Sequence, residues 1–419
     1  MLKGETAAGI PVTSAETKRA THRRIDILDS YRALAILFVL SFHYTVRWAA
    51  PEDPAQHLAP GAIFDPVTPL GYGALGVEFF FMISGFVILM TLERCRNVGD
   101  FALRRFARLW PALLIGATLT TAIVAWLGPA DWQVSAGDYF TSVTLIDPSI
   151  TSWLTHRPGL KWVDGAYWSL WIELCFYAWA AAVYLLVRKR FVVAWLGLFA
   201  LLLIGMVFSG WHIPAFIVDF LNKTHLARPI QLVASFSSRW LAPYLFISHF
   251  PYFTVGICAY EIWSNGRFRK VAIGGIAVAA ALTSYWALTG KSVFVNAEVI
   301  DVTIINTLMF SLFILFTFDH RLVRIFNFRP LVLVGQASYS LYLLHQNIGI
   351  AVMRRGIASG VPYLLMLPLT VLAMIGLALS IFQFVEIPAK AWLLARAPRI
   401  VAAIDRYLPG LSYESIVGS

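Results

Sequence analysis

The sequence predicts an all-α, polytopic membrane protein, and three observations lead to this fold class. Of the 419 residues, 59% are hydrophobic and only 13% are charged. Soluble domains carry about 25% charged residues, and the mean hydropathy of +0.70 is far above what a soluble surface allows. Apolar runs long enough to cross a bilayer also recur along the whole chain. This composition excludes a soluble enzyme, a disordered chain and a small disulfide scaffold.

Ten segments have the roughly 20 mostly apolar residues that a membrane-spanning helix needs. They are residues 27–47, 71–92, 109–127, 166–187, 191–209, 241–263, 271–289, 299–318, 330–350 and 363–385. The polar residues 1–24 lack the apolar region and cleavage site of a signal peptide and are expected to form a tail. We therefore expect a transmembrane domain over residues 25–390 and a short second tail over residues 391–419.

Lys and Arg residues are distributed unequally between the loops on the two sides of the predicted spans. Loops on the side of the N-terminus carry 23 of them, and the opposite loops carry 9. Because positively charged loops stay in the cytoplasm, both termini are predicted to be cytoplasmic. The same rule explains the net charge of +10, so no nucleic-acid partner is expected.

Two ionisable side chains in the first span need a functional reason, because a charge inside a span costs at least a few kcal/mol. Arg32 lies near the cytoplasmic end and His43 lies deep in the span. In a regular helix the two residues share one face, and His43 lies about 16 Å further into the bilayer. A buried imidazole at this depth is suited to proton transfer, with packing as the simpler alternative.

Three further ionisable residues fall at a depth similar to that of His43. Glu78 lies in the second span, Glu173 in the fourth and His345 in the ninth. Because unrelated positions would be scattered across the bilayer, this convergence predicts a polar cavity within the helix bundle. Ser84 and Gly85 lie in the same span as Glu78. Both are small residues, which also permit close packing of two helices.

Two arginines precede the third predicted span. Arg105 and Arg108 are three residues apart, so they project from one side of a helix. Pro111 then fits the first turn of the third span. Paired guanidinium groups at the cytoplasmic surface suit phosphate groups, which they bind with bidentate hydrogen bonds. A role as a topology anchor is the alternative.

These residues occur in motifs that resemble those of the acyltransferase 3 family of integral-membrane O-acyltransferases. The resemblance covers roughly residues 25–390 and rests on six motifs in the expected order. The motifs are Leu28-Asp29-Ser30-Tyr31-Arg32 with His43; Gly76-Val77-Glu78 with Phe80-Phe81 and Ser84-Gly85; Arg105 and Arg108 before Pro111; Trp168-Ser169-Leu170 with Glu173 and Phe176-Tyr177; Ser338-Tyr339-Ser340-Leu341-Tyr342 with His345; and Glu386 before Pro388. The family often has Gly where Ser30 stands, a change that alters no reacting group.

The resemblance implies an acyl-CoA donor, usually acetyl-CoA, that binds from the cytoplasm. It also implies that His43 is the catalytic residue and that Arg32, Arg105 and Arg108 bind the donor. The enzyme would lie in the bacterial inner membrane and would transfer the acyl group to a hydroxyl of a carbohydrate. A surface polysaccharide, a lipopolysaccharide and a glycosylated small molecule all remain open as acceptors, and the sequence does not predict an oligomeric state.

The chemistry of these residues suggests a mechanism in which His43 is the general base toward the acceptor hydroxyl. Glu173 or Glu78 would orient its imidazole, and Ser84 or Ser169 would donate a hydrogen bond to the oxyanion. A transient acyl-histidine or acyl-serine remains an alternative. Side chains of the matched motifs are the candidates for substrate binding: Ser84, Trp168, Ser169, Tyr342 and His345.

A membrane transporter is the competing class, because buried charges in many spans are typical of transporters. The sequence lacks the inverted repeats and paired broken helices that many transporters have. A glycosyltransferase would need acidic ligands in a cytoplasmic loop, where only Glu93 and Asp100 occur. The sequence predicts no metal site, and the three cysteines are interpreted as ordinary thiols.

Overall fold

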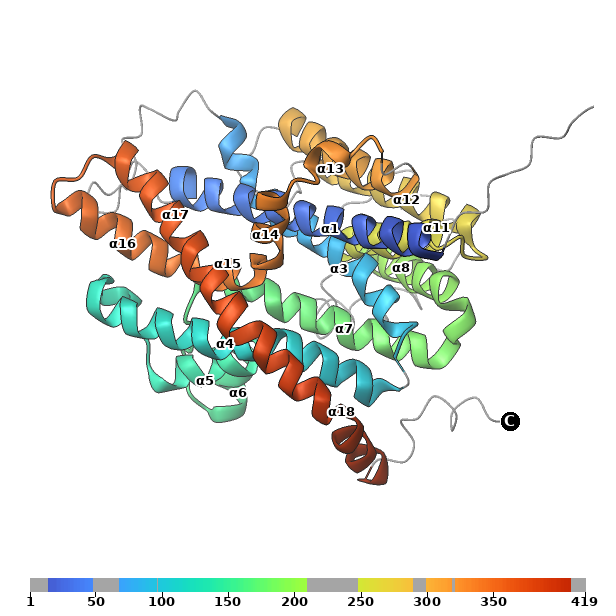
Figure 1. The fold of residues 1–419 in the computed structure, drawn as a ribbon, viewed down its shortest axis with the longest axis horizontal. Helices are drawn as coiled ribbons and strands as arrows, with labels where there is room; N and C mark the ends of the chain where they lie inside the picture. The colour runs from blue at the N-terminus through green and yellow to red at the C-terminus, as the bar shows by residue number, and fades with distance from the viewer. Residues whose placement is uncertain are drawn as a thin grey trace, which may run out of the picture.

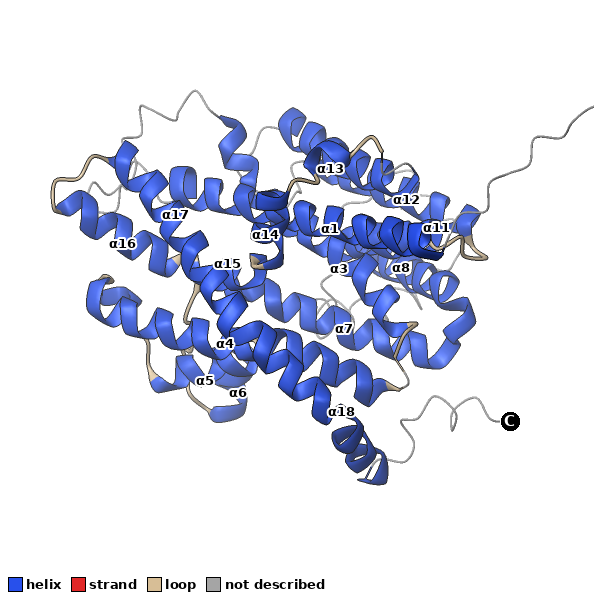
Figure 2. Cartoon of the chain, in the orientation of Figure 1, coloured by secondary structure: helices blue, strands red, loops and turns tan. Residues whose placement is uncertain are grey.

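The structure, a computed structural model, describes residues 14–47, 68–95, 97–208, 248–288, 299–318 and 321–407. Within these residues all regular elements are helices, and no β-strand occurs (Figure 2). The predicted all-α class is therefore confirmed. The α-helices are α1 (Ser14–Phe42), α3 (Gly76–Leu92), α4 (Val98–Leu127), α5 (Ala136–Thr144), α6 (Pro148–Thr155), α7 (Trp168–Val187), α8 (Phe191–Phe208), α11 (Phe250–Trp263), α12 (Arg269–Leu288), α13 (Val299–Phe318), α14 (Arg329–Gln336), α15 (Ser338–Leu344), α16 (Asn347–Ala358), α17 (Tyr363–Ile381) and α18 (Ile387–Tyr407).

Short 3-10 and π-helical segments extend or connect these helices. They are η1 (His43–Arg47), η2 (Thr68–Leu75), η3 (Ala130–Trp132), η4 (Gly165–Tyr167), η5 (Arg188–Arg190), η7 (Arg324–Phe326) and η8 (Phe382–Glu386). Both η1 and η8 are π-helical. Single π-helical turns inside longer helices occur frequently at functional sites, and both of these turns adjoin the candidate site described below.

Six of the described helical segments are long and apolar enough to cross a membrane. They are Asp26–Arg47, Leu70–Leu92, Val98–Leu127, Gly165–Leu203, Arg269–Leu288 and Tyr363–Ala397. The chain is therefore a multi-pass membrane protein, and the expected number of ten spans stays a prediction. Gly165–Leu203 contains two of the predicted spans, because α7 ends at η5 and α8 starts directly after it. Of the predicted span 241–263, residues 241–247 lie outside the described residues.

The predicted span 330–350 is not one continuous helix. It is divided into α14, α15 and the start of α16, with interruptions at Ala337 and at His345–Gln346. The second interruption has a tertiary cause, because the backbone N–H of Asn347 donates to the Asp164 carboxylate (2.8 Å). Hydropathy along one segment does not report such a contact, so the sequence could not predict the break.

The helices form two groups with the candidate site between them. In the first group α1 packs on α3 and α14, α3 packs on α11, and α11 packs on α12. In the second group α4 packs on α15, α16 and α18, which lies beside α4 in Figure 1. The turns between α3 and α4, α7 and α8, and α11 and α12 all lie at the right-hand end in Figure 1. These turns belong to the side on which the sequence concentrates its Lys and Arg residues.

Helices α3 and α11 approach each other so closely that only glycine fits between them. A Cβ atom on Gly256 would lie 1.9 Å from the Met82 carbonyl oxygen, and one on Gly85 would lie 2.2 Å from the Phe253 carbonyl oxygen. Small residues permit this close packing of membrane helices. The predicted packing role of Gly85 is thus confirmed.

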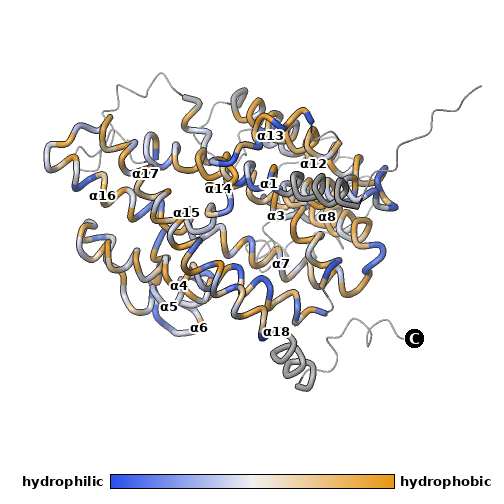
Figure 3. The backbone as a smooth tube through the Cα atoms, in the orientation of Figure 1, coloured by the Kyte–Doolittle hydropathy of each residue, from blue (hydrophilic) through white to orange (hydrophobic). Residues whose placement is uncertain are grey.

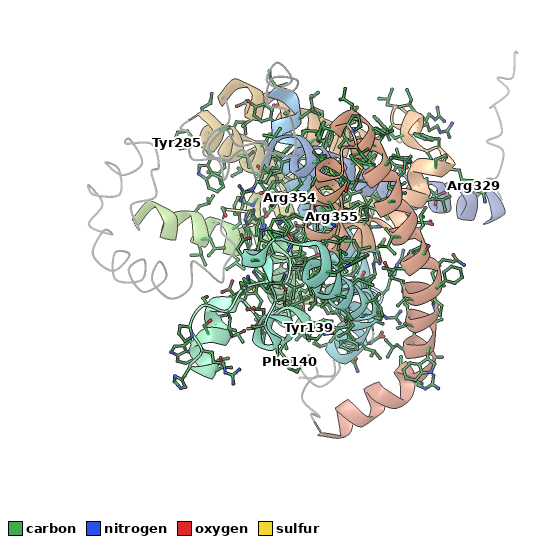
Figure 4. The ribbon with its side chains drawn as sticks, turned by 90° about the vertical axis from the view of Figure 1, so that its left-hand side faces the viewer. Tyr139, Phe140, Tyr285, Arg329, Arg354 and Arg355 are labelled. Atoms are coloured by element: carbon green, nitrogen blue, oxygen red, sulfur yellow. The ribbon has the colours of Figure 1, made fainter. Side chains whose placement is uncertain are left out.

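The outer surface of the bundle is apolar. Figure 3 shows hydrophobic residues along most helices and hydrophilic residues mainly at turns and in a few places inside the bundle. Leu201, Val278 and Leu372 are 51–66% exposed, and such a surface is suited to contact with lipid chains. Figure 4 views the molecule from the left-hand end of Figure 1, where Arg354 and Arg355 of α16 lie above Tyr139 and Phe140 of α5.

Candidate functional site

A cavity, here called the inner cavity, lies between α1, α3, α4, α7 and α15. It contains about 730 Å³ of space that protein atoms do not fill. Seven of the eleven candidate residues from the sequence line it. They are Arg32, Ser84, Arg105, Arg108, Ser169, Glu173 and Tyr342. The cavity combines guanidinium groups with hydroxyl groups and a carboxylate, but of the four residues that predicted a polar cavity only Glu173 lines it.

Helix α4 brings two of the arginines to the inner cavity. It starts at Val98, because the side chain of the N-cap residue Asn97 accepts a hydrogen bond from a backbone N–H of the first turn. The helix therefore begins well before the predicted span 109–127, and Pro111 lies in its interior rather than in its first turn. Arg105 and Arg108 share one helical face as predicted, and both line the cavity.

Two of the three guanidinium groups form ion pairs with carboxylates. Arg32 lies 2.5 Å from Asp29, one turn earlier in α1. Arg108 lies 2.5 Å from Glu386 in η8, and that carboxylate also accepts a hydrogen bond from Ser340. These carboxylates balance the charge of two arginines in the protein without ligand, and they hold both guanidinium groups in place.

Arg105 lies in a different environment. Its guanidinium group donates to the Thr91 hydroxyl (2.9 Å) and lies over the rings of Phe101 and Tyr177. Its Nε is buried and has no hydrogen-bond partner among the described residues. A buried donor without a partner is costly, so Arg105 is ready to bind an acceptor group such as a phosphate oxygen.

The inner wall of the cavity is a network of hydroxyl groups around one carboxylate. Glu173 accepts hydrogen bonds from Ser84 and Tyr177, both at 2.6 Å. Beside them, the hydroxyl groups of Ser169 and Tyr342 are 2.7 Å apart, and the Tyr342 hydroxyl donates to a backbone carbonyl of η4. Each hydroxyl has one hydrogen to donate, and in this structure these hydrogens are directed to acceptors within the protein.

A second cavity, here called the entrance cavity, adjoins the first. It is lined by parts of α1, α4, α14, α17, η8 and α18 and contains about 1280 Å³ of space between atoms. Arg32 and Arg108 line both cavities. Lys390, Gln336 and Gln383 add further polar groups to the entrance cavity. The sequence analysis missed Lys390, although its position one helical turn after the Glu386 motif could have indicated it.

His43 does not line the inner cavity. It is the first residue of η1, and its ring lies 4.9 Å from the ring of His345 and 5.1 Å from that of Phe42. His345 in turn lies 5.4 Å from the ring of Tyr342, which does line the cavity. His345 thus contacts a ring that lines the cavity, and His43 contacts His345.

Glu78 and Trp168 form a separate cluster with His249. The Nδ1 atom of His249 lies 2.8 Å from the Glu78 carboxylate, and the Trp168 ring lies 5.4 Å from the imidazole. Phe81 separates this cluster from the inner cavity, since it contacts His249 and also lines the cavity. The structure therefore brings these two candidates together, but not with the other site residues.

The expected orientation of His43 by Glu78 or Glu173 is not found. Glu78 is paired with His249, and Glu173 accepts from two hydroxyl groups of the cavity wall. The similar depth that hydropathy predicts for these residues does not say which helix faces meet. Among the described residues, the polar neighbours of His43 are the His345 imidazole and Arg47 rather than a carboxylate.

Asp164 is a buried residue that the sequence analysis missed. Its carboxylate accepts hydrogen bonds from the backbone N–H groups of Ala166 and Asn347, both at 2.8 Å. Burial raises the pKa of Asp164 to about 7, although the two N–H donors act in the opposite direction. The residue ties the segment before α7 to the break between α15 and α16, and its place two residues before Ala166 is a typical capping position.

The described part of the chain contains no group of three His, Cys, Asp or Glu side chains that could hold a metal ion. Cys95, Cys175 and Cys258 are all free thiols, as expected from the sequence.

Comparison with known proteins gives several relatives with named activities. The chain is 22% identical to "Peptidoglycan O-acetyltransferase OatA" of Listeria monocytogenes over 79% of this chain and 50% of that protein. It is 29% identical to "O-acetyl transferase" of Shigella phage Sf6 over 43% of this chain and 52% of that protein. It is 24% identical to "Nodulation protein 10" of Rhizobium leguminosarum over 67% of this chain and 70% of that protein.

The chain spans about half the length of the first two of these relatives. No solved structure matches the chain. The family model described as "Acyltransferase domain" matches residues 25–383, which include the inner cavity, His43 and His345. The chain therefore belongs to the acyltransferase 3 family, as its motifs indicated.

Proposed function

We propose that this protein is a membrane O-acyltransferase that moves an acyl group, usually acetyl, from acyl-CoA to a hydroxyl group of a carbohydrate. One observation carries the proposal: three arginines converge on a cavity whose far wall holds hydroxyl groups and a carboxylate, next to a pair of histidines. The family and relatives named as O-acetyltransferases support it. They also make the transporter alternative the weaker one.

The donor would enter through the entrance cavity. Its phosphate groups would bind Arg32, Arg105 and Arg108, with Lys390 as a fourth cationic group in the entrance cavity. Guanidinium groups suit this task because they bind phosphates through paired hydrogen bonds. The entrance cavity is built from helix ends that the Lys and Arg count assigns to the cytoplasm, where CoA is available.

The pantetheine arm would extend through the inner cavity, with the thioester near Tyr342. Hydroxyl groups of Ser84, Ser169 and Tyr342 line that part of the wall. One of them would have to turn from its present acceptor to donate to the carbonyl oxygen as it becomes negative. Because His43 does not line the inner cavity and Tyr342 contacts His345, side chains around Tyr342 would have to rearrange for the thioester, the acceptor and the imidazole to meet. Apo geometries at active sites are often looser than those of the reacting complex.

His43 would act as the general base. Its imidazole accepts the proton of the acceptor hydroxyl while the oxygen attacks the thioester carbon. The new C–O bond forms as the C–S bond breaks, and the proton then passes to the thiolate and gives free CoA. No acyl-enzyme is required in this direct transfer, although a transient acyl-serine at Ser84 is the alternative that the Ser84–Glu173 hydrogen bond allows.

The acceptor would be a carbohydrate reached from the outer side of a bacterial cytoplasmic membrane. One relative is named for peptidoglycan, which contains sugar hydroxyl groups. Incubation of the purified protein with acetyl-CoA and soluble glycan fragments tests the proposal. We expect release of free CoA thiol that depends on the glycan, and a glycan whose mass increases by one acetyl group. Failure to acetylate any glycan while binding CoA would contradict a carbohydrate acceptor.

Lys390 allows a further test of the donor path. We expect Lys390→Ala to weaken CoA binding about tenfold, because a hydrogen bond to a charged group contributes about 1.5–3 kcal/mol and 1.4 kcal/mol is a factor of ten. Isothermal titration with CoA measures this change. Arg396→Ala on the same helix is the matched control, since the Arg396 guanidinium lies over the Trp392 ring, away from both cavities. Equal affinities of the two variants would remove Lys390 from the donor site.

A further inference from the structure

The rings of His43 and His345 are neighbours, and each has a buried nitrogen without a hydrogen-bond partner among the described residues. Their ring centroids are 4.9 Å apart, and the ring planes are inclined by 71°. The Nδ1 atom of His43 and the Nε2 atom of His345 are both buried and have no hydrogen-bond partner among the described residues. Two unpaired polar atoms at one place are costly, so this arrangement has a reason other than stability.

The protonation of His345 follows from its hydrogen bond. Its Nδ1 lies 2.8 Å from the backbone carbonyl oxygen of Tyr342. A carbonyl oxygen can only accept, so Nδ1 carries the hydrogen and donates it. The Nε2 atom of the neutral ring then holds a lone pair and can only accept. His345 thus presents an acceptor toward His43.

The backbone around both histidines is held by specific contacts. The Tyr44 hydroxyl in η1 donates to the carbonyl oxygen of His345 (2.6 Å), and the Tyr363 hydroxyl donates to the carbonyl oxygen of Tyr44 (2.8 Å). His345 itself ends α15 at the interruption before α16. These bonds fix η1 against the helix break, so the two rings stay opposite each other.

We propose that His345 is a positioning residue for His43, an inference that rests on the proposed function. During acyl transfer the Nδ1–H of His43 donates to Nε2 of His345, which leaves Nε2 of His43 with its lone pair toward the acceptor hydroxyl. In that state the two ring nitrogens would lie about 2.9 Å apart, the usual length of such a hydrogen bond. His345 then takes the role that a carboxylate has in the triads of hydrolases.

Two amide substitutions separate this role from packing. The amide group of Gln lies where Nε2 of a histidine stands, and that of Asn lies where Nδ1 stands. His345→Gln therefore keeps an acceptor toward His43, whereas His345→Asn keeps only the bond to the Tyr342 carbonyl. We expect Asn to lower kcat about 10- to 100-fold, less than the loss of a general base costs. KM for acetyl-CoA should change less than about twofold, because His345 is not part of the proposed binding site for acetyl-CoA. The Gln variant should retain most of kcat.

The same substitutions in a His43→Ala background complete the test. If His345 acts through His43, neither substitution lowers the residual rate further, since the two effects are not additive. Equal kcat for the Gln and Asn variants, or a further loss in the His43→Ala background, would overturn the positioning role. Full activity of His43→Ala alone would instead contradict the proposed function of His43. Thermal unfolding of each variant shows whether it is folded.

Discussion

Replacing His43 with alanine is expected to lower kcat for acyl transfer about 100- to 10,000-fold, the usual contribution of a general base. Without the imidazole, the acceptor hydroxyl keeps its proton as it approaches the thioester and remains a weak nucleophile. The affinity for CoA should be unchanged, because His43 is not part of the cavity lining that holds the arginines. Thiol release from acetyl-CoA in the presence of acceptor measures kcat, and isothermal titration measures CoA binding.

Retained activity of the His43→Ala variant would assign the acyl transfer to residues other than His43. Appreciable turnover by His43→Ala would indicate that the reaction takes place inside the inner cavity, where Ser84 donates to Glu173 at 2.6 Å. Ser84→Ala is then the informative variant, since a nucleophilic serine would be lost with its hydroxyl. If direct transfer at His43 is correct, Ser84→Ala retains much more activity than His43→Ala.

Removal of Arg105 is expected to weaken CoA binding about tenfold or more, because its hydrogen bond to a phosphate joins two charged groups. Arg105→Ala is the cleanest of the arginine substitutions. The guanidinium contacts Thr91 and two aromatic rings rather than a carboxylate, so no buried carboxylate is left without a partner. Acceptor binding should not change. Titration with CoA and, separately, with glycan measures both affinities.

Arg108 needs a paired substitution. Its removal alone leaves the buried Glu386 unpaired, and breaking a buried ion pair destabilises a protein by about 3–5 kcal/mol. We therefore combine Arg108→Ala with Glu386→Gln in the Arg105→Ala protein and expect a loss in CoA affinity of about 100-fold for two charge-assisted contacts. Arg396→Ala is again the control. Unchanged CoA affinity in a folded variant would refute the donor role of these arginines.

The local signals in the sequence were sufficient for the all-α class and for several cavity-lining residues, but not for the number of spans or for the break within residues 330–350. Helical spacing placed Arg105 and Arg108 on one face, and both line the inner cavity. Glu173 and Ser84, assigned to different spans, do meet there. These predictions depend on period and depth along single helices, which neighbouring residues in the chain determine.

Contacts between distant segments could not be predicted in the same way. The pairing of Glu78 with His249 depends on how α3 meets the start of α11. The break before α16 depends on Asp164, which lies 183 positions away from Asn347 in the chain. No sequence pattern around one residue of either pair identifies its partner. A single sequence therefore cannot predict these two contacts.

By itself, the sequence determined that this chain is an apolar helical membrane protein with a few cationic and ionisable residues inside its apolar segments, because burial in lipid requires long apolar helices and makes each charge an exception. Only the tertiary structure decided which of these charges meet. In the structure Glu78 pairs with His249 outside the cavity, and Glu173 accepts hydrogen bonds from hydroxyl groups. The ring of His345 contacts the ring of His43. The physical reason is that side-chain partners depend on the rotation and crossing of packed helices, which hydropathy does not encode.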